Sequence, residues 1–224
     1  MRDFLNRLPD LTDRPIPGGG RILLVAGAVL LAVAIFLPLW QIHLEAPQYP
    51  EGGLDMYIYS HKLDAGNDGQ DLKEINNLNH YIGMAPIEEE DFAEMTFIPF
   101  LLGGFALLSL RAAFFGTVGA AIDTLVLFVY FGAFSLWRFY YQLYTYAHNL
   151  DPKAAMDIEP FTPILIGWKQ IANFTQYSFP REGSILLLGA VVCFGTAIWM
   201  GVRSGRETAA PDADERSDAE AMSA

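Results

Sequence analysis

Four long apolar stretches constrain this chain more than any other feature of its sequence. They cover residues 21–40, 95–110, 113–137 and 184–202, and they contain almost no charged side chains. About 20 apolar residues in a helix, at about 1.5 Å of rise per residue, cross the roughly 30 Å hydrocarbon core of a bilayer. The sequence therefore predicts an all-α membrane protein with four transmembrane helices.

The first apolar stretch follows a basic leader with Arg2, Arg7 and Arg14, as a cleaved secretion signal would. However, the stretch is longer than the roughly 7–15 apolar residues of a signal core. The bulky sequence LPLWQIHLEAP follows it, where a signal peptide would have small residues at its cleavage site. We therefore expect a helix that the mature protein retains.

The distribution of basic residues predicts the orientation of these helices. Arg14 and Arg21 precede the first helix, and no Lys or Arg follows it within the next 20 residues. Cytoplasmic flanks of membrane helices are enriched in Lys and Arg. We therefore expect both terminal segments, residues 1–20 and 203–224, in the cytoplasm of a bacterium, with the helices in its inner membrane. Residues 203–224 are acidic and rich in Ala and Ser, which predicts a disordered tail.

Two polar segments, residues 41–94 and 138–182, then lie outside the cytoplasm and are expected to form a small cap. In the first, residues 54–63 alternate between polar and apolar side chains, which indicates a short strand. Residues 72–82 have the apolar spacing of a helix, with Asp71 and Glu74 spaced as in a capping box and Gly83 at the end. In the second, residues 164–174 predict a short interfacial helix. The sequence leaves open whether the two segments contact each other.

The stretch INNLNHYIGM, residues 75–84, contains candidate ligands for a soft metal. His80 and Met84 lie four residues apart, so they share one face if the helix continues. Imidazole and thioether groups together suit copper, especially Cu(I), whereas zinc sites seldom use a thioether. The full candidate set, which includes every histidine of the chain, is His80, Met84, His61, Met56, His43 and His148. The alternative is that these side chains serve only packing and hydrogen bonding.

Other features limit the classes of function. The net charge of −12 argues against a basic surface for nucleic acid, so we expect no such partner. No nucleotide-binding loop, nucleophile elbow, zinc-protease or Cys-x-x-Cys motif occurs, and we expect no enzymatic activity. Asp123 is the single acid inside an apolar stretch, where it serves either proton or ion transfer or simply solvation near a helix end. Cys193, the single cysteine, is expected to behave as a small apolar residue.

LEAPQYPEGG, residues 44–53, and INNLNHYIGM resemble the pattern of an uncharacterised family of bacterial multi-pass membrane proteins, in which LEAPQYPEG precedes IN-x-LNHYIGM. PILIGWKQIANFTQYSFP, residues 163–180, is similar to another stretch of that family. One departure is the additional Gly53, which shifts the turn before Met56. Members of the family are often encoded near nitrous oxide reductase and copper accessory proteins. The resemblance therefore implies a role in copper supply.

Three functional hypotheses follow. The leading one is a non-enzymatic membrane accessory protein for copper supply to, or maturation of, a periplasmic cuproenzyme such as nitrous oxide reductase, with that enzyme or a copper chaperone as partner. The second is a metal-free structural or docking subunit of a membrane complex. The third is a small transporter or quinone-linked subunit that uses Asp123. The lipid bilayer is a partner in all three.

Overall fold

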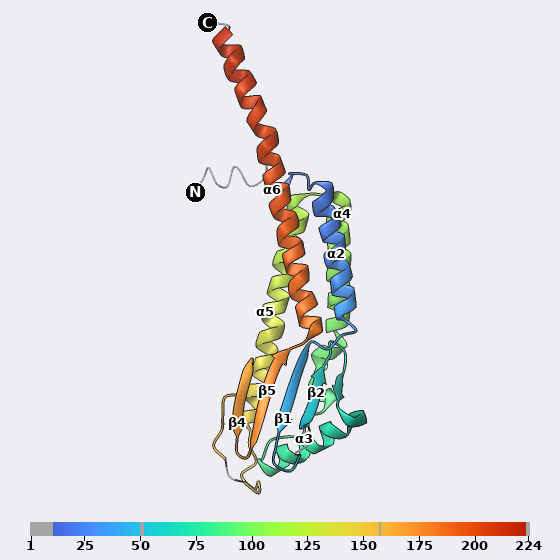
Figure 1. Cartoon of the computed structure of the whole chain (residues 1–224), viewed down its shortest axis with the longest axis vertical. Helices are drawn as coiled ribbons and strands as arrows, with labels where there is room; N and C mark the ends of the chain where they lie inside the picture. Colours follow the sequence, from blue (N-terminus) through green and yellow to red (C-terminus); the bar gives the residue numbers. More distant parts are fainter. Residues whose placement is uncertain (1–10, 50–51, 157, 223–224) are drawn as a thin grey trace. The chain divides into compact units, whose positions relative to one another are not determined.

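The computed structural model describes residues 11–49, 52–156 and 158–222, and from residue 205 onward it describes the backbone only. The basic leader with Arg2 and Arg7, and the side chains of the acidic tail, therefore lie outside the described part. The longer helices are α2 (Gly18–Ala34), α3 (Gln70–Tyr81), α4 (Ile98–Phe115), α5 (Val118–His148) and α6 (Glu182–Met222), and Figure 1 shows their order along the chain. Short 3₁₀ turns cover Asn67–Gly69, Glu89–Asp91 and Ala93–Thr96.

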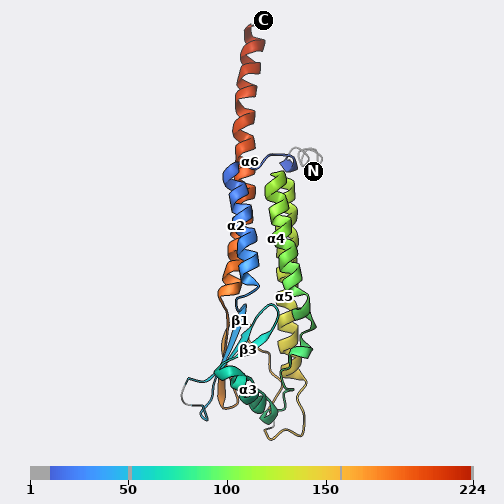
Figure 2. The same cartoon turned by 90° about the vertical axis from the view of Figure 1, so that its right-hand side faces the viewer.

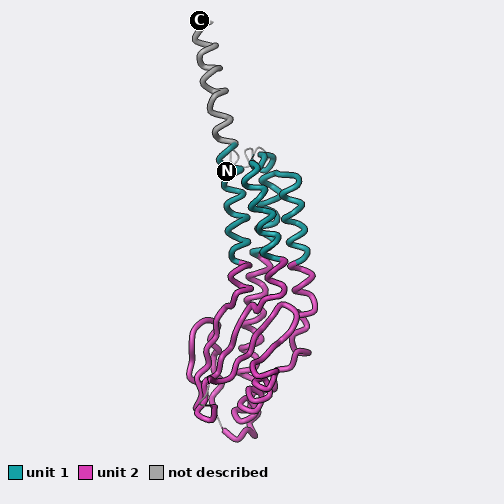
Figure 3. Tube along the Cα trace, turned by 45° about the vertical axis from the view of Figure 1, so that its right-hand side comes forward, with its two compact units in different colours: residues 1–31, 103–129, 188–224 teal, residues 32–102, 130–187 magenta. Residues whose placement is uncertain are grey.

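The chain divides into two compact units, which Figure 3 colours separately. Unit 1 consists of residues 1–31, 103–129 and 188–224, and its described part is mainly helical. Unit 2 consists of residues 32–102 and 130–187 and contains all of the strands described. Each unit is assembled from segments far apart in the sequence, so neither corresponds to a continuous stretch of chain.

In the described part of the chain, three helices are long and apolar enough to cross a membrane: α4, α5 and the segment Glu182–Ser204 of α6. α2 is apolar but shorter, with 17 residues, so the structure shows three such helices where the sequence predicted four. Apolar side chains point outward from unit 1: Leu107 is 68%, Phe114 81% and Leu188 65% exposed. Such continuous apolar surface is typical of contact with lipid.

Close helix packing in unit 1 depends on small residues. The ring of Phe194 is fully buried and lies against Gly27, where a Cβ atom would collide with it. The hydroxyl of Ser109 is also buried and donates a hydrogen bond to the carbonyl of Leu24, at 2.7 Å. Small residues and hydroxyl groups at helix contacts are typical of membrane bundles.

Unit 2 contains a five-stranded antiparallel sheet, so the protein is mostly helical but not strictly all-α, and the predicted class is correct only in part. The strands are β1 (Trp40–Glu45), β2 (Leu54–Ile58), β3 (Leu63–Ala65), β4 (Gly167–Ile171) and β5 (Phe174–Pro180), in the spatial order β3-β2-β1-β5-β4. β1 pairs with β2 on one side and with β5 on the other. The two polar segments of the sequence therefore share one sheet, with β1 and β5 at its centre.

The helix predicted for residues 164–174 is wrong, because these residues contribute to the β4–β5 hairpin. Phe174, Gln176 and Ser178 are buried at every second position of β5, which is the period of a strand. Ala172, in the turn before β5, has a positive φ of 49°, and Gly167, at the start of β4, has a φ of 124°. Both conformations are incompatible with a continuous helix.

The helix predicted around residues 72–82 is present as α3, which lies beside β2 and β3 (Figure 2). Its predicted capping box does not form, because Gly69 is the N-cap residue and makes no side-chain cap. The carboxylate of Asp71 is instead buried, and it accepts hydrogen bonds from the backbone N–H of Asp55 and from the amide of Asn67. The predicted end at Gly83 agrees with its positive φ of 79°, just after the last helical residue, Tyr81.

The core of unit 2 lies between one face of the sheet, α3 and the end of α5. Alternate residues of β1 and β2 point into it, together with residues of α3 and of the β4–β5 hairpin. Its buried members are Trp40, Ile42, Leu44, Ala46, Leu54, Met56, Ile75, Leu78, Ile82, Ile171 and Phe174. The opposite face of the sheet is consequently left to the polar residues of the same strands.

Candidate functional site: the outer face and the inner cavity of the sheet

The outer face of the sheet carries polar and aromatic residues in cross-strand rows. His43 of β1 lies opposite Asp55 of β2 on one side and opposite Tyr177 of β5 on the other. Trp168 of the edge strand β4 extends this row, since it pairs with Tyr177. Trp168 is 65% exposed, so the row ends in a large, solvent-accessible indole ring.

His43 is held by carboxylates of the same face. Its Nδ1 lies 2.9 Å from Oδ1 of Asp55, and its Nε2 lies 3.8 Å from Oε1 of Glu45. The side-chain amide of Gln41 donates a second hydrogen bond to the same Asp55 oxygen, at 2.6 Å. The Asp55 carboxylate therefore favours the tautomer with a proton on Nδ1, which leaves Nε2 directed toward Glu45.

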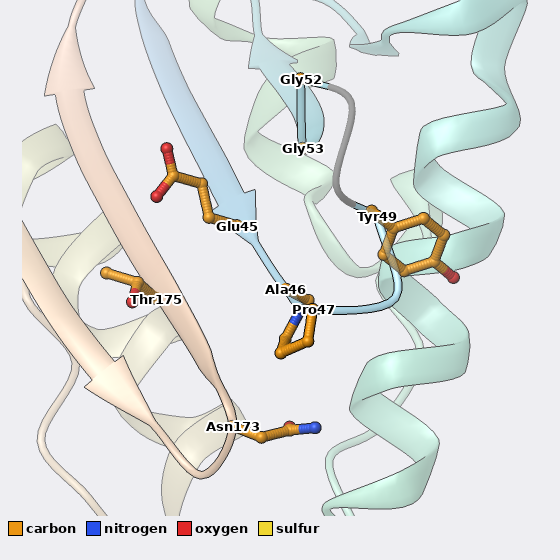
Figure 4. A pocket seen from close by; sticks show the side chains of 8 residues that line it. All are labelled: Glu45, Ala46, Pro47, Tyr49, Gly52, Gly53, Asn173 and Thr175. Atoms are coloured by element: carbon orange, nitrogen blue, oxygen red, sulfur yellow. The ribbon is translucent and has the colours of Figure 1, made fainter.

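An open depression of about 410 Å³ lies at the end of this face, around Glu45 (Figure 4). Figure 4 shows that Glu45 comes from β1, Thr175 from β5, Asn173 from the turn before β5, and Pro47 from the segment after β1. The hydroxyl of Tyr177 donates a hydrogen bond to Oε2 of Glu45, at 3.2 Å. This hydrogen bond to a carboxylate raises the pKa of Tyr177 above its ordinary value.

Tyr49 also lines the depression and ties it to α3. Its hydroxyl donates a hydrogen bond to Oε2 of Glu74, at 2.5 Å. Burial and this hydrogen bond raise the pKa of Tyr49 to about 12, and the same bond lowers the pKa of the Glu74 carboxyl. The segment after β1 is thus fixed to the helix by a hydrogen bond with a carboxylate.

On the inner face, a cavity of about 60 Å³ lies within the core of unit 2. Its lining is mostly apolar, but it also includes the methionines Met56 and Met84 and the amide-bearing residues Asn79, Gln142 and Gln176. Asn79 is 5% exposed, and within the described residues its Nδ2 is a buried donor with no hydrogen-bond partner. A buried donor without a partner is costly, so the cavity can hold a small molecule with an acceptor atom, such as water.

Of the six predicted metal ligands, the structure brings Met56 and Met84 to the same cavity. The four imidazoles lie elsewhere. His43 belongs to the outer face, opposite to Met56, and His61 and His80 are exposed. α3 ends at Tyr81, so His80 and Met84 do not share a continuing helical face.

His148 ends α5, where it stacks on Tyr144 at 3.7 Å between ring centroids. Its Nδ1 lies 3.0 Å from the carbonyl oxygen of Tyr144. Among the residues that the structure describes, no three His, Cys, Asp or Glu side chains are grouped so that they could hold a metal ion.

Two further residues singled out in the sequence belong to unit 1. Asp123 is exposed on the first turns of α5, and the hydroxyl of its neighbour Thr124 bonds to the carbonyl of Ala120 rather than to the acid. Cys193 is a half-buried free cysteine of α6.

Sequence reasoning missed Glu45, Asn79 and the pairing of His43 with Asp55. His43 and Asp55 lie on two different strands, β1 and β2, and the sequence does not show the register in which these strands pair. The alternation of WQIHLE was the available signal, because it places Gln41, His43 and Glu45 on one face of a strand. The helical spacing of α3 was the signal for Asn79, because it places this residue one turn after the apolar Ile75 and one turn before Ile82, on the buried face.

The fold and the exposed apolar surface define a membrane protein with a helix-and-sheet unit built from its two polar segments. Comparisons with known proteins add no narrower class: no protein-family model, no curated protein and no solved structure matches this chain.

Proposed function

We propose that this chain is a membrane-anchored, non-enzymatic accessory protein that binds a partner protein through unit 2, outside the bilayer. The observation that carries the proposal is the asymmetry of the sheet. One face is buried in the core, whereas the other presents polar residues and the exposed rings of Trp168 and Phe179, which are 65% and 44% exposed. Exposed aromatic residues among polar ones are typical of protein interfaces.

We further propose four membrane spans, with α2 as the first. Its 17 residues extend about 25 Å, close to the shortest length that crosses a bilayer. Before α2, the N–H of Ile16 bonds to the carbonyl of Gly116, and the N–H of Val118 bonds to the carbonyl of Arg14. The chain entering α2 therefore lies beside the α4–α5 turn, one membrane crossing from the segment before α4. The chain that leaves α2 forms β1 and β2 and then continues to the start of α4. α2 therefore connects the same two regions as α4, so a membrane crossing by α4 supports a crossing by α2.

The charge of unit 2 supports a cationic partner. Its sequence contains 16 acidic and six basic residues, a formal charge of −10 out of −12 for the whole chain. A field of one sign increases the rate of association with oppositely charged proteins and weakens as salt is added. We therefore expect the partner to present a basic surface.

Site-specific photo-crosslinking in living cells tests this proposal. A photoreactive phenylalanine analogue replaces Trp168 on the outer face or, as a control, Tyr81 on α3, which is 56% exposed. We expect one defined protein adduct from position 168 that position 81 does not give, with a yield that falls as salt rises in isolated membranes. Equal adducts from both positions, or none, would contradict docking at this face.

A second candidate function, handling of Cu(I) for a periplasmic cuproenzyme such as nitrous oxide reductase, is favoured by the cavity that Met56 and Met84 share. Two thioethers are soft ligands that bind Cu(I) and release it readily. After anaerobic loading with Cu(I), we expect about one copper per chain in the purified protein and a marked loss in Met56→Leu with Met84→Leu. Met156→Leu, at a 37% exposed position, is the matched control. Equal copper in all three proteins would exclude this cavity as the site.

A further inference from the structure

We infer that the outer face of the sheet binds arginine side chains of the partner protein, and that Glu45 and its depression form the central subsite. This inference rests on the proposed docking function and names the chemistry of the partner. It depends on the charges, the rings and the space on this face, each of which the described residues provide.

The first argument is an imbalance of charge. Lys62 pairs with Asp64, Arg138 with Glu94 and Arg181 with Glu182. Within the described residues, the basic side chain within 4 Å of Glu45 and of Asp55 is that of His43, which carries a charge only when it is protonated.

Glu45 is also the more accessible of the two acids, since its side chain is 59% exposed and that of Asp55 is 28% exposed. Glu45 is therefore the carboxylate of this face that is best placed to receive a cation from a partner.

The second argument is that the face already holds one guanidinium group. Nη1 of Arg181 donates a hydrogen bond to Oε1 of Gln41, at 2.6 Å. Its Cζ lies 5.9 Å from the centre of the Tyr57 ring. The chain's own arginine thus shows that a guanidinium fits between an acceptor oxygen and an aromatic ring on these strands.

The neighbouring part of the face repeats this combination. The Tyr177 ring lies beside the carboxylate of Glu45, to which its hydroxyl is bonded, and Trp168 pairs with Tyr177 from the edge strand. The tilted ring of His43 completes the group, 5.9 Å from the Tyr177 ring between centroids. An acceptor and aromatic rings are therefore present at this second position, too.

The third argument is space. The depression beside Glu45 measures about 410 Å³ and is also lined by Asn173 and Thr175. Gly53 brings the segment after β1 close to β1, because a Cβ there would lie 2.6 Å from the carbonyl oxygen of Leu44 and 2.7 Å from the His43 ring. Its φ of 68° also favours glycine. Gly52 and Gly53 are among the residues that line the depression.

Arginine fits these features better than lysine. Its guanidinium is planar, stacks on aromatic rings, and forms two parallel hydrogen bonds with one carboxylate. It is also more weakly hydrated than an ammonium group, so it loses less on leaving water. The expected partner segment therefore presents arginine toward Glu45, Tyr177 and Trp168.

Binding of a defined peptide to the detergent-purified full chain tests the inference. The probe is a fluorescein-labelled peptide of four glycine–arginine repeats, compared with the same peptide carrying lysine or neutral citrulline. We expect the arginine peptide to bind more tightly than the lysine peptide, and the citrulline peptide to bind at least tenfold more weakly. Glu45→Gln should weaken binding of the arginine peptide about tenfold, since a charge-assisted pair is lost.

Glu90→Gln is the matched control, because it removes one charge from an exposed position in the turn Glu89–Asp91, which is not part of the lining of the depression. We expect it to change the affinity less than twofold. Trp168→Ala should weaken the arginine peptide more than the lysine peptide if the indole ring stacks on the guanidinium. Equal effects of Glu45→Gln and Glu90→Gln, or equal binding of arginine and citrulline peptides, would overturn the inference. If the crosslink from position 168 still forms in that case, docking stands and only its arginine chemistry fails.

Discussion

At the scale of single residues, the buried side-chain amide of Asn79 indicates whether the inner cavity is empty or holds a small molecule. The backbone carbonyl of Asn79 accepts hydrogen bonds from the N–H groups of Ile82 and Met84, and these bonds do not depend on the side chain. Its Nδ2, in contrast, is a buried donor without a partner among the described residues, and Asn79 is one of the residues that line the inner cavity. An unsatisfied buried donor costs about 1–3 kcal/mol, whereas a donor bonded to a trapped water or ligand does not.

Replacing Asn79 with leucine distinguishes these two cases. If the amide is unsatisfied, Asn79→Leu should increase the free energy of unfolding by about 1 kcal/mol and raise the melting temperature by roughly 2–4 °C for a chain of this size. Thermal unfolding in detergent measures this, with Asn77→Leu, an exposed position of the same helix, as the control. A lower melting temperature for Asn79→Leu would mean that the amide binds a molecule in the cavity.

At the scale of secondary structure, the sequence was informative wherever one period dominated. Hydropathy located the apolar helices, and the spacing of Ile75 and Leu78 located α3 together with its end before Gly83. It failed at residues 164–174, because a short apolar run fits a strand and a buried helix equally well. Gly167 inside that run was the available warning. The partners of each strand could not be predicted, since register depends on contacts between segments more than 100 residues apart, such as Trp40 with Pro180.

The β4–β5 hairpin offers a test at this scale, because its turn contains a strained residue. Ala172 adopts a φ of 49°, a left-handed conformation that costs a residue with a Cβ roughly 1–2 kcal/mol. Ala172→Gly removes this strain but adds flexibility to the unfolded chain, so we expect a net gain of about 0.5–1 kcal/mol in the free energy of unfolding. Ala65→Gly in β3, where φ is not positive, should instead destabilise the protein. Thermal melts of the two variants measure the difference, and a loss for both would show that the turn is unstrained in solution.

At the scale of the whole molecule, sequence and structure together constrain the path of the chain through the membrane. β1 and β5 pair directly, so residues on both sides of the α4–α5 hairpin belong to one sheet and must lie on one side of the bilayer. Hydropathy alone predicted that the two polar segments lie on the same side of the membrane, but it could not show that they pair in one sheet. If α6 crosses the bilayer, the two termini share a side only when α2 crosses as well, and the 17 residues of α2 are close to the minimum for a span.

Topology reporters at three positions decide this question. If α2 crosses, a fluorescent protein that folds only in the cytoplasm should fluoresce when fused at the N-terminus and when fused after Ser204, and alkaline phosphatase should be active only when fused after Asp151. The physical reason is that residues 14–16 are hydrogen-bonded to the α4–α5 turn, which lies across the bilayer from the sheet if α4 crosses. If α2 does not cross, the N-terminal reporter lies with the sheet and the reporter after Ser204 lies opposite, because only α6 then separates them. If one terminal reporter is cytoplasmic and the other extracytoplasmic, the four-span arrangement is refuted for either orientation of the protein. If both terminal reporters are extracytoplasmic, the four spans stand and only the predicted orientation is reversed.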